Sequence, residues 1–146
     1  MSEGSKRRLR MWVRLLAVTR RSENRLREFL RLNHHTTLPR FDAMAALYRR
    51  REGMTMGELS RMLLVSNGNS TAVIGRLERE GLVRRRPSEA DRRTIYVTLS
   101  EEGTRQFERL ADSHEREIEA MFSGLSESDI DTLTAILKRM GKGESE

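Results

Sequence analysis

Most apolar positions of the chain recur at the spacing of helices. Over residues 6–33 arginines fill the positions between the apolar ones, which are Leu9, Trp12, Val13, Leu16, Leu26, Phe29 and Leu30. This spacing predicts one long helix with an apolar stripe. The segment "NHHTTLP" should end it, and Thr37 is a suitable N-cap for a second helix with Pro39 in its first turn. That second helix should end near Gly53.

Two shorter helices are predicted next. Thr55 and Glu58 have the spacing of a capping box, in which the carboxylate reaches back to the backbone N–H of the cap, and a third helix should run from there through Leu63. The stretch "LVSNGNS" interrupts the pattern. Ser66 or Asn67 is then the expected N-cap of a fourth helix, "NSTAVIGRLERE", which Gly81 should stop.

The pattern changes to alternation after the fourth helix. Two strand-like runs, "LVRRRP" and "TIYVTL", predict a β-hairpin. Its second run should bury Ile95, Val97 and Leu99 and leave Thr94, Tyr96 and Thr98 in contact with water. Ser100 then caps a long fifth helix, and Ser126 with Asp129 opens a sixth. The elements predict a single, mainly helical domain over residues 1–146, with a winged helix-turn-helix lobe at 38–99 between helices at 6–33 and 100–140.

The fourth helix has the size and polarity of a helix that reads the major groove of DNA. Amides and hydroxyls near its start can bind base edges; they belong to Ser66, Asn67, Asn69, Ser70 and Thr71. Arg76 and Arg79, further along, are suited to phosphates or a guanine. Capping of the helix explains Ser66 and Asn67 equally well. For Ser70 and Thr71, which should lie inside the helix, DNA contact is the favoured interpretation.

Charged residues gather at the tip of the predicted hairpin. Arg92 and Arg93 can reach an adjacent minor groove, where narrow A·T-rich stretches concentrate negative potential. Asp91 would be repelled by phosphate, so we expect it to pair with an arginine of the same tip and fix its direction. A solvated charged turn is the alternative.

Charge and composition narrow the class of protein. The net charge is +6, and residues 1–53 carry 14 Lys or Arg against 5 Asp or Glu, whereas residues 101–146 carry 6 against 12. A basic first half predicts a polyanionic partner. The chain has no cysteine, no apolar run long enough to span a membrane, and no nucleophile–base pair or phosphate loop, so catalysis, thiol chemistry, a cofactor and membrane insertion are not expected. We expect a cytoplasmic protein.

Residues 55–103 resemble the multiple-antibiotic-resistance-regulator (MarR) family of transcription factors. The family pattern D-x-R…V-x-L-[ST]…G is matched by Asp91, Arg93, Val97, Leu99, Ser100 and Gly103. The pattern V-S…R-L-E-x-x-G-L-V is matched by Val65, Ser66, Arg76, Leu77, Glu78, Gly81, Leu82 and Val83. The resemblance implies that Arg93 enters the minor groove. Many relatives carry a basic residue where this chain has Ala72, so one contact with DNA is expected to be missing.

The resemblance also implies a homodimer and a small-molecule effector. In this family the first, fifth and sixth helices interlock about a two-fold axis, and the partner is an inverted-repeat operator in double-stranded DNA. Some relatives bind aromatic acids, or their acyl-CoA thioesters, between the dimer helices and the DNA-binding lobe. The segment "TTLPRFD" resembles the corresponding sequence of regulators of hydroxycinnamate and aromatic-acid catabolism. A repressor released by such an effector is therefore expected.

Two groups of residues are candidates for the effector site. Arg40 and Trp12 suit a carboxylate and a ring, with apolar neighbours, Leu16, Phe41 and Met44. Coenzyme A phosphates would meet Arg14, Arg20, Arg21 and Arg25. Core or dimer packing is the competing interpretation for the apolar members, and a surface cation is the competing interpretation for Arg40.

The residues alone are also compatible with other functions. A winged helix that binds RNA or protein without an effector fits the same elements, with only the hairpin arginines against it. The arginine-rich first helix also fits a membrane-surface amphipath. His34, His35 and His114 lack the spacing of metal ligands, so no metal site is predicted.

Overall fold

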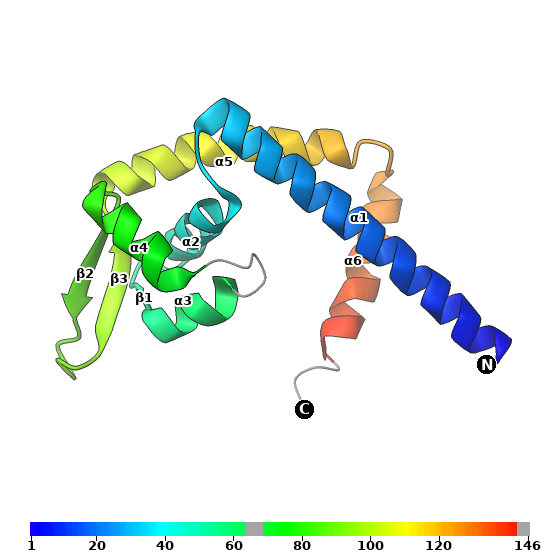
Figure 1. The fold of residues 1–146 in the computed structure, drawn as a ribbon, viewed down its shortest axis with the longest axis horizontal. Helices are drawn as coiled ribbons and strands as arrows, with labels where there is room; N and C mark the ends of the chain where they lie inside the picture. Colours follow the sequence, from blue (N-terminus) through cyan, green and yellow to red (C-terminus); the bar gives the residue numbers. More distant parts are fainter. Residues whose placement is uncertain (64–68, 143–146) are drawn as a thin grey trace. The chain divides into compact units, whose positions relative to one another are not determined.

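The computed structural model describes residues 1–63 and 69–142, which form two compact units, Met1–His114 and Glu115–Glu146. The first unit holds α1 (Glu3–His34), α2 (Leu38–Arg49), β1 (Met54–Thr55), α3 (Met56–Leu63), α4 (Ser70–Arg79), β2 (Val83–Pro87) and β3 (Ile95–Leu99) (Figure 1). The helix α5 (Glu101–Met121) begins in the first unit and ends in the second, which also contains α6 (Glu127–Lys142). The predicted fold class, a mainly helical winged helix-turn-helix, is confirmed.

The core of the first unit lies among α2, α3, α4 and the sheet. Its fully buried side chains include Leu47, Leu59, Ile74, Leu77 and Val97. Each side chain of this size contributes about 1.5–3 kcal/mol when it is removed from water. This core fixes α3 and α4 against the strands and so sets the direction in which the fourth helix presents its polar face.

The sheet has three antiparallel strands in the order β1-β3-β2. Val83 pairs with Leu99 at the base of the hairpin, and Pro87 pairs with Ile95 at the far end. The predicted alternation is only partly correct, because Val97 is buried whereas Ile95 is exposed. Ile95 is the first residue of β3, next to the turn, and 37% of its surface is exposed.

Caps and glycines delimit the helices. Thr37 caps α2 as predicted, accepting a hydrogen bond from the backbone N–H of Arg40 at 3.3 Å. Gly81 follows α4 with φ of 76°, a left-handed conformation that glycine adopts without strain. Ser100 caps α5 through the N–H of Gly103 at 3.0 Å. The reciprocal bonds of Ser126 and Asp129 form the predicted capping box before α6.

The N-cap of α4 differs from the prediction. Asn69 occupies it, and its side-chain oxygen accepts from the N–H of Ala72 at 3.2 Å. Ser66 and Asn67, which were the expected caps, lie outside the described residues. The helix therefore begins at Ser70, and Ser70 and Thr71 form its first turn.

The second unit has an apolar face that is open to solvent within one chain. A groove runs along the end of α5 and the length of α6, lined by Ile118, Phe122, Leu125, Ile130, Leu133 and Leu137. Leu133 and Leu137 are 44% and 46% exposed. In the first unit, the N-terminal half of α1 exposes Leu9, Trp12 and Val13. No described helix is long and apolar enough to cross a membrane.

Candidate nucleic-acid interface

The start of α4 presents a small polar surface. Asn69 and Thr71 are exposed, as is Ala72 beside them. The oxygen of Asn69 is used by the cap, but its amide group still lies at the helix start, where the partial positive charge of the helix favours an anion. Asn69 and Thr71 therefore stay candidates for contact with DNA.

Ser70 has a different position from the one expected. Its side chain is 8% exposed, and its hydroxyl lies 2.6 Å from the hydroxyl of Ser60 on α3. A hydroxyl that is buried and bonded in this way has little surface left for contact with a base. We therefore reassign Ser70 from base contact to joining α4 to α3. The sequence did not reveal this because Ser70 is equally typical of a helix start.

Two arginines extend the cationic surface along α4. Arg76 and Arg79 are exposed in the last turns of the helix. Neighbouring acidic residues are partly occupied elsewhere, since Glu78 pairs with Arg85 of β2 at 3.3 Å and Glu80 pairs with Arg40 at 2.6 Å. The cations of α4 are thus placed where phosphates can approach them.

The hairpin tip is organised by Asp91. Its Oδ1 accepts from the backbone N–H of Arg93 at 3.0 Å, and its Oδ2 accepts from the hydroxyl of Thr94 at 3.4 Å. The hydroxyl of Ser88 accepts from the backbone N–H groups of Ala90 and Asp91. The role of Asp91 is thus to stabilise the conformation of the turn, and not to contact DNA.

The arginine side chains of the tip are free to reach outward. The guanidinium of Arg93 is 3.9 Å from the Asp91 carboxylate and its side chain is 97% exposed. Arg92 is exposed beside it. An ion pair of this length at the surface restrains the side chain weakly. The hairpin tip thus combines a hydrogen-bonded backbone with two exposed cations.

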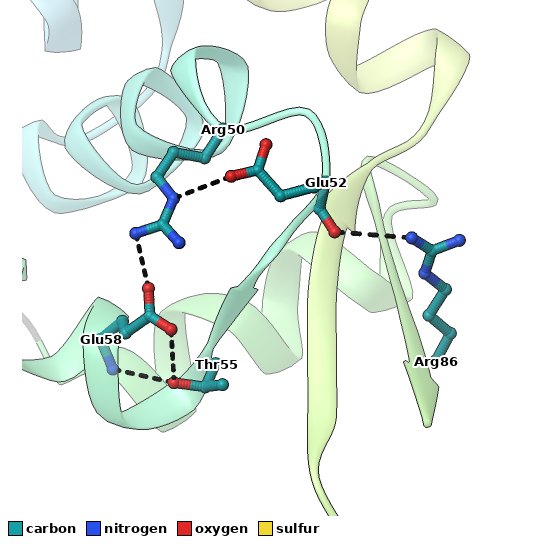
Figure 2. Close-up of polar contacts among 5 residues, drawn as sticks. All are labelled: Arg50, Glu52, Thr55, Glu58 and Arg86. Carbon is teal, nitrogen blue, oxygen red and sulfur yellow. Dashed lines mark hydrogen bonds and ion pairs between the residues drawn. The ribbon is translucent and has the colours of Figure 1, made fainter. Parts of the chain in front are cut away.

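A network between α2, α3 and strand β2 was not predicted as part of the site. Arg50, at the C-terminal end of α2, pairs with Glu52 at 3.3 Å and with Glu58 of α3 at 2.6 Å (Figure 2). Thr55 donates its hydroxyl to Glu58 and accepts from the Glu58 N–H, so the predicted capping box forms with the hydroxyl, not the backbone N–H, as partner of the carboxylate. Arg86 of β2 donates to the carbonyl of Glu52 at 3.4 Å. The Thr-x-x-Glu spacing indicated the cap, but nothing in the sequence indicated Arg50.

The candidate effector residues do not gather into one pocket of the described chain. Phe41 and Met44 are core residues, and Phe41 stacks on His114 with ring centroids 4.3 Å apart. Burial lowers the pKa of His114 from its ordinary value. Arg40 is held by Glu80 and by the hydroxyl of Thr36.

The α1 candidates lie elsewhere along the helix. Leu16 is half-buried and Trp12 is 51% exposed. At a rise of about 1.5 Å per residue, Trp12 lies about 27 Å along the helix axis from Leu30, the buried residue of α1. Trp12 and Phe41 therefore do not share a site through the buried end of α1.

The arginines expected to meet coenzyme phosphates are exposed along α1. At about 100° per residue, Arg14, Arg21 and Arg25 lie on one face of the helix, whereas Arg20 lies on the apolar side. Among the described residues, no group of three or more His, Asp or Glu is placed to hold a metal ion.

Known proteins are similar to this chain in sequence and in fold. Residues 34–94 match the model of the MarR family. The chain is 40% identical over 82 residues to YkoM of Bacillus subtilis, an HTH-type transcriptional regulator, and this match covers 56% of the chain and 53% of YkoM. The chain thus spans about half the length of that relative.

Solved structures extend the likeness to the full chain. A MarR family transcriptional regulator from Silicibacter pomeroyi superposes with a TM-score of 0.81 at 26% identity, covering 98% of this chain and 99% of that one. A mutant MarR from E. coli complexed with operator DNA shares the fold with a TM-score of 0.76 at 22% identity, covering 95% and 99%. Over residues 34–94 the chain is thus similar to the MarR family of transcriptional regulators, and over nearly its whole length it shares the fold of the Silicibacter protein.

Proposed function

We propose that the protein is a homodimeric transcriptional regulator that binds an inverted repeat in double-stranded DNA. The observation that supports the proposal most directly is the set of exposed polar and cationic side chains on α4 and on the hairpin. These side chains are polar at the start of α4 and cationic further along, at Arg76 and Arg79, while Arg92 and Arg93 extend from the hairpin tip. The two elements suit a major groove and an adjacent minor groove.

The exposed apolar residues support the dimer. Within α6, Ile130, Leu133 and Leu137 are each more than 40% exposed, and the N-terminal half of α1 exposes Trp12 and Val13. Contiguous exposed apolar surface on a regulator of this polarity is typical of an interface between chains. A second copy of this chain presents the same apolar surfaces on α1 and α6 and is therefore the proposed partner.

The dimer is tested by charge in the α6 stripe. Leu133→Glu with Leu137→Glu should convert the dimer into monomers in analytical ultracentrifugation and weaken binding to a duplex. Lys138→Glu, on the same helix but outside the stripe, is the matched control and should leave the mass unchanged. A double variant that remains dimeric would contradict this assignment.

Duplex DNA is favoured over RNA as the partner because the proposed binding mode places α4 in a major groove and the hairpin tip in a minor groove. The deep, narrow major groove of A-form RNA does not admit a helix. A DNA duplex and an RNA duplex of the same sequence should therefore differ in affinity, which fluorescence anisotropy measures directly. Preferential binding of the RNA would refute the proposed partner.

We also propose an effector for the regulator: an aromatic acid or its coenzyme A thioester, bound between the dimer helices and the DNA-binding lobes. The resemblance of "TTLPRFD" to regulators of aromatic-acid catabolism supports the acid. The cations on one face of α1, at Arg14, Arg21 and Arg25, support the thioester because its phosphates need positive partners. With Phe41 and Met44 in the core, these residues would support the site rather than line it.

The effector must favour a spacing of the lobes that does not match the half-sites, because a ligand that binds both spacings equally shifts nothing. Coupling of this kind usually changes affinity about 5–150-fold. Calorimetry with 4-hydroxycinnamate and its coenzyme A thioester, with and without DNA, tests it. Operator DNA should weaken ligand binding by the same factor by which ligand weakens DNA binding. Equal ligand affinity in both cases would exclude this route of regulation.

A further inference from the structure

Glu52, in the turn after α2, joins strand β2 of the hairpin to the helices through two contacts. Its carboxylate accepts from Arg50 Nε at 3.3 Å, and its backbone carbonyl accepts from Arg86 Nη2 at 3.4 Å. Arg50 also reaches Glu58, in the first turn of α3, at 2.6 Å. Figure 2 shows these contacts running from α2 to α3 on one side and to β2 on the other.

The chain beside Glu52 is pressed against the central strand. Gly53 has a φ of +105°, and a Cβ added there would lie 3.0 Å from Thr98 Cγ2 and 3.1 Å from the Val97 carbonyl oxygen. Thr55 pairs with Tyr96 of β3, which in turn pairs with Arg86 of β2. The side chain of Arg86 therefore reaches past the middle strand to Glu52, which lies two residues before β1.

The hairpin is also supported by the ion pair between Arg85 of β2 and Glu78 of α4, at 3.3 Å. Toward the tip, Arg86, Pro87 and Ile95 are exposed, and the hydrogen bonds of the turn are internal to residues 88–94. A two-stranded ribbon of this kind twists easily. A small rotation at its root displaces the tip, where the candidate minor-groove cations lie, by more than it displaces the root.

We propose that Arg86 and Arg50 are positioning residues for DNA binding: they hold Glu52 from two sides and so fix the hairpin tip relative to α3 and α4. This inference rests on the proposed DNA binding. Neither arginine contacts the duplex; each acts through Glu52. The net effect of one such exposed hydrogen bond should be roughly two- to fivefold in affinity.

The test is a mutant cycle between the root and the tip of the hairpin. The probe is a DNA duplex selected from a random pool by the wild-type protein. Arg86→Met is measured alone and in the Arg93→Ala background. Arg84→Met is the matched control, since Arg84 lies two residues away on the same face of β2 and is also exposed. Circular dichroism confirms that each variant is folded at the assay temperature.

The expected result is a loss in the wild-type background that becomes smaller when Arg93 is already absent, because a tip that has lost one of its two cations gains less from correct placement. The salt dependence should not change with Arg86→Met, and Arg50→Met should behave in the same way. Arg84→Met should have an effect below twofold in both backgrounds.

Three results would overturn the proposal. An equal fold-loss in both backgrounds would show that Arg86 acts independently of the tip. A salt slope lowered by about one unit would show a direct phosphate contact. Unchanged affinity for both variants would show that the network does not affect binding. If the wild-type protein selects no duplex at all, the proposed function itself fails, and that outcome is distinct from the other three.

Discussion

Replacing Gly103 with alanine should be among the most damaging single changes in the DNA-binding lobe. Gly103 lies in the first turn of α5, where the helix passes over the junction of α4 and β2. A Cβ on this residue would lie 2.0 Å from the carbonyl oxygen of Leu82 and 2.9 Å from its carbonyl carbon. These are backbone atoms, so no side-chain rotation removes the clash.

The junction is also unable to retreat without losing hydrogen bonds. The Leu82 carbonyl accepts from the N–H of Ser100 at 2.9 Å, and the Ser100 hydroxyl donates to the Gly81 carbonyl at 2.6 Å. Overpacking costs about 1–3 kcal/mol, and each lost hydrogen bond adds roughly 1 kcal/mol. We therefore expect Gly103→Ala to lower the free energy of unfolding by about 3–5 kcal/mol, a large part of the roughly 5–15 kcal/mol typical of a domain.

Urea unfolding followed by circular dichroism measures this loss. Gly57→Ala is the control, because its Cβ would meet neighbouring atoms only at 3.9 Å and alanine favours a helix over glycine by up to about 1 kcal/mol. Gly57→Ala should be neutral or stabilising. If Gly103→Ala unfolds at the wild-type urea concentration, the packing of α5 on the strand junction described here is incorrect.

Three further changes test other parts of the lobe. Arg93→Ala should weaken duplex binding and lower the salt slope by about one unit, and binding unchanged at every salt concentration would contradict a cationic contact at the tip. Ser60→Ala should reduce both stability and DNA affinity by leaving the buried Ser70 hydroxyl without its partner, at a cost of about 1–3 kcal/mol in unfolding free energy; a variant as stable as wild type would make that bond unimportant. His114 has a pKa lowered by burial, so its charged form disfavours the fold and stability should fall as pH decreases through the ordinary value of 6.5. His114→Gln should reduce that pH dependence in thermal unfolding between pH 5 and pH 8, and an identical slope would exclude His114 as its source.

Local patterns predicted much of the fold correctly. The apolar spacing gave the helices, and the caps at Thr37, Ser100 and Ser126 were identified because their side chains bond to backbone within three residues. The α4 cap was misplaced because several Ser and Asn residues in "LVSNGNS" are equally suitable. The choice of Asn69 depends on how Ile74 and Leu77 pack in the core, which is a tertiary effect.

The parts of the site that were not predicted depend on contacts distant in sequence. The hydroxyl of Ser70 bonds to that of Ser60, ten residues away, and Arg86 donates to Glu52 across 34 residues. No periodicity carries such information. Asp91 was predictable as an organiser of the tip because its partners, Arg93 and Thr94, follow it by only two and three residues.

The most direct test of the central claim is selection of binding sites from a random DNA pool, followed by the stoichiometry of the purified complex. The account predicts an enriched inverted repeat whose half-site centres are about 10–10.5 base pairs apart, or a multiple of that spacing, occupied by two protomers. Enrichment of a single unrepeated site by one protomer, or no enrichment of sequence at all, would contradict it.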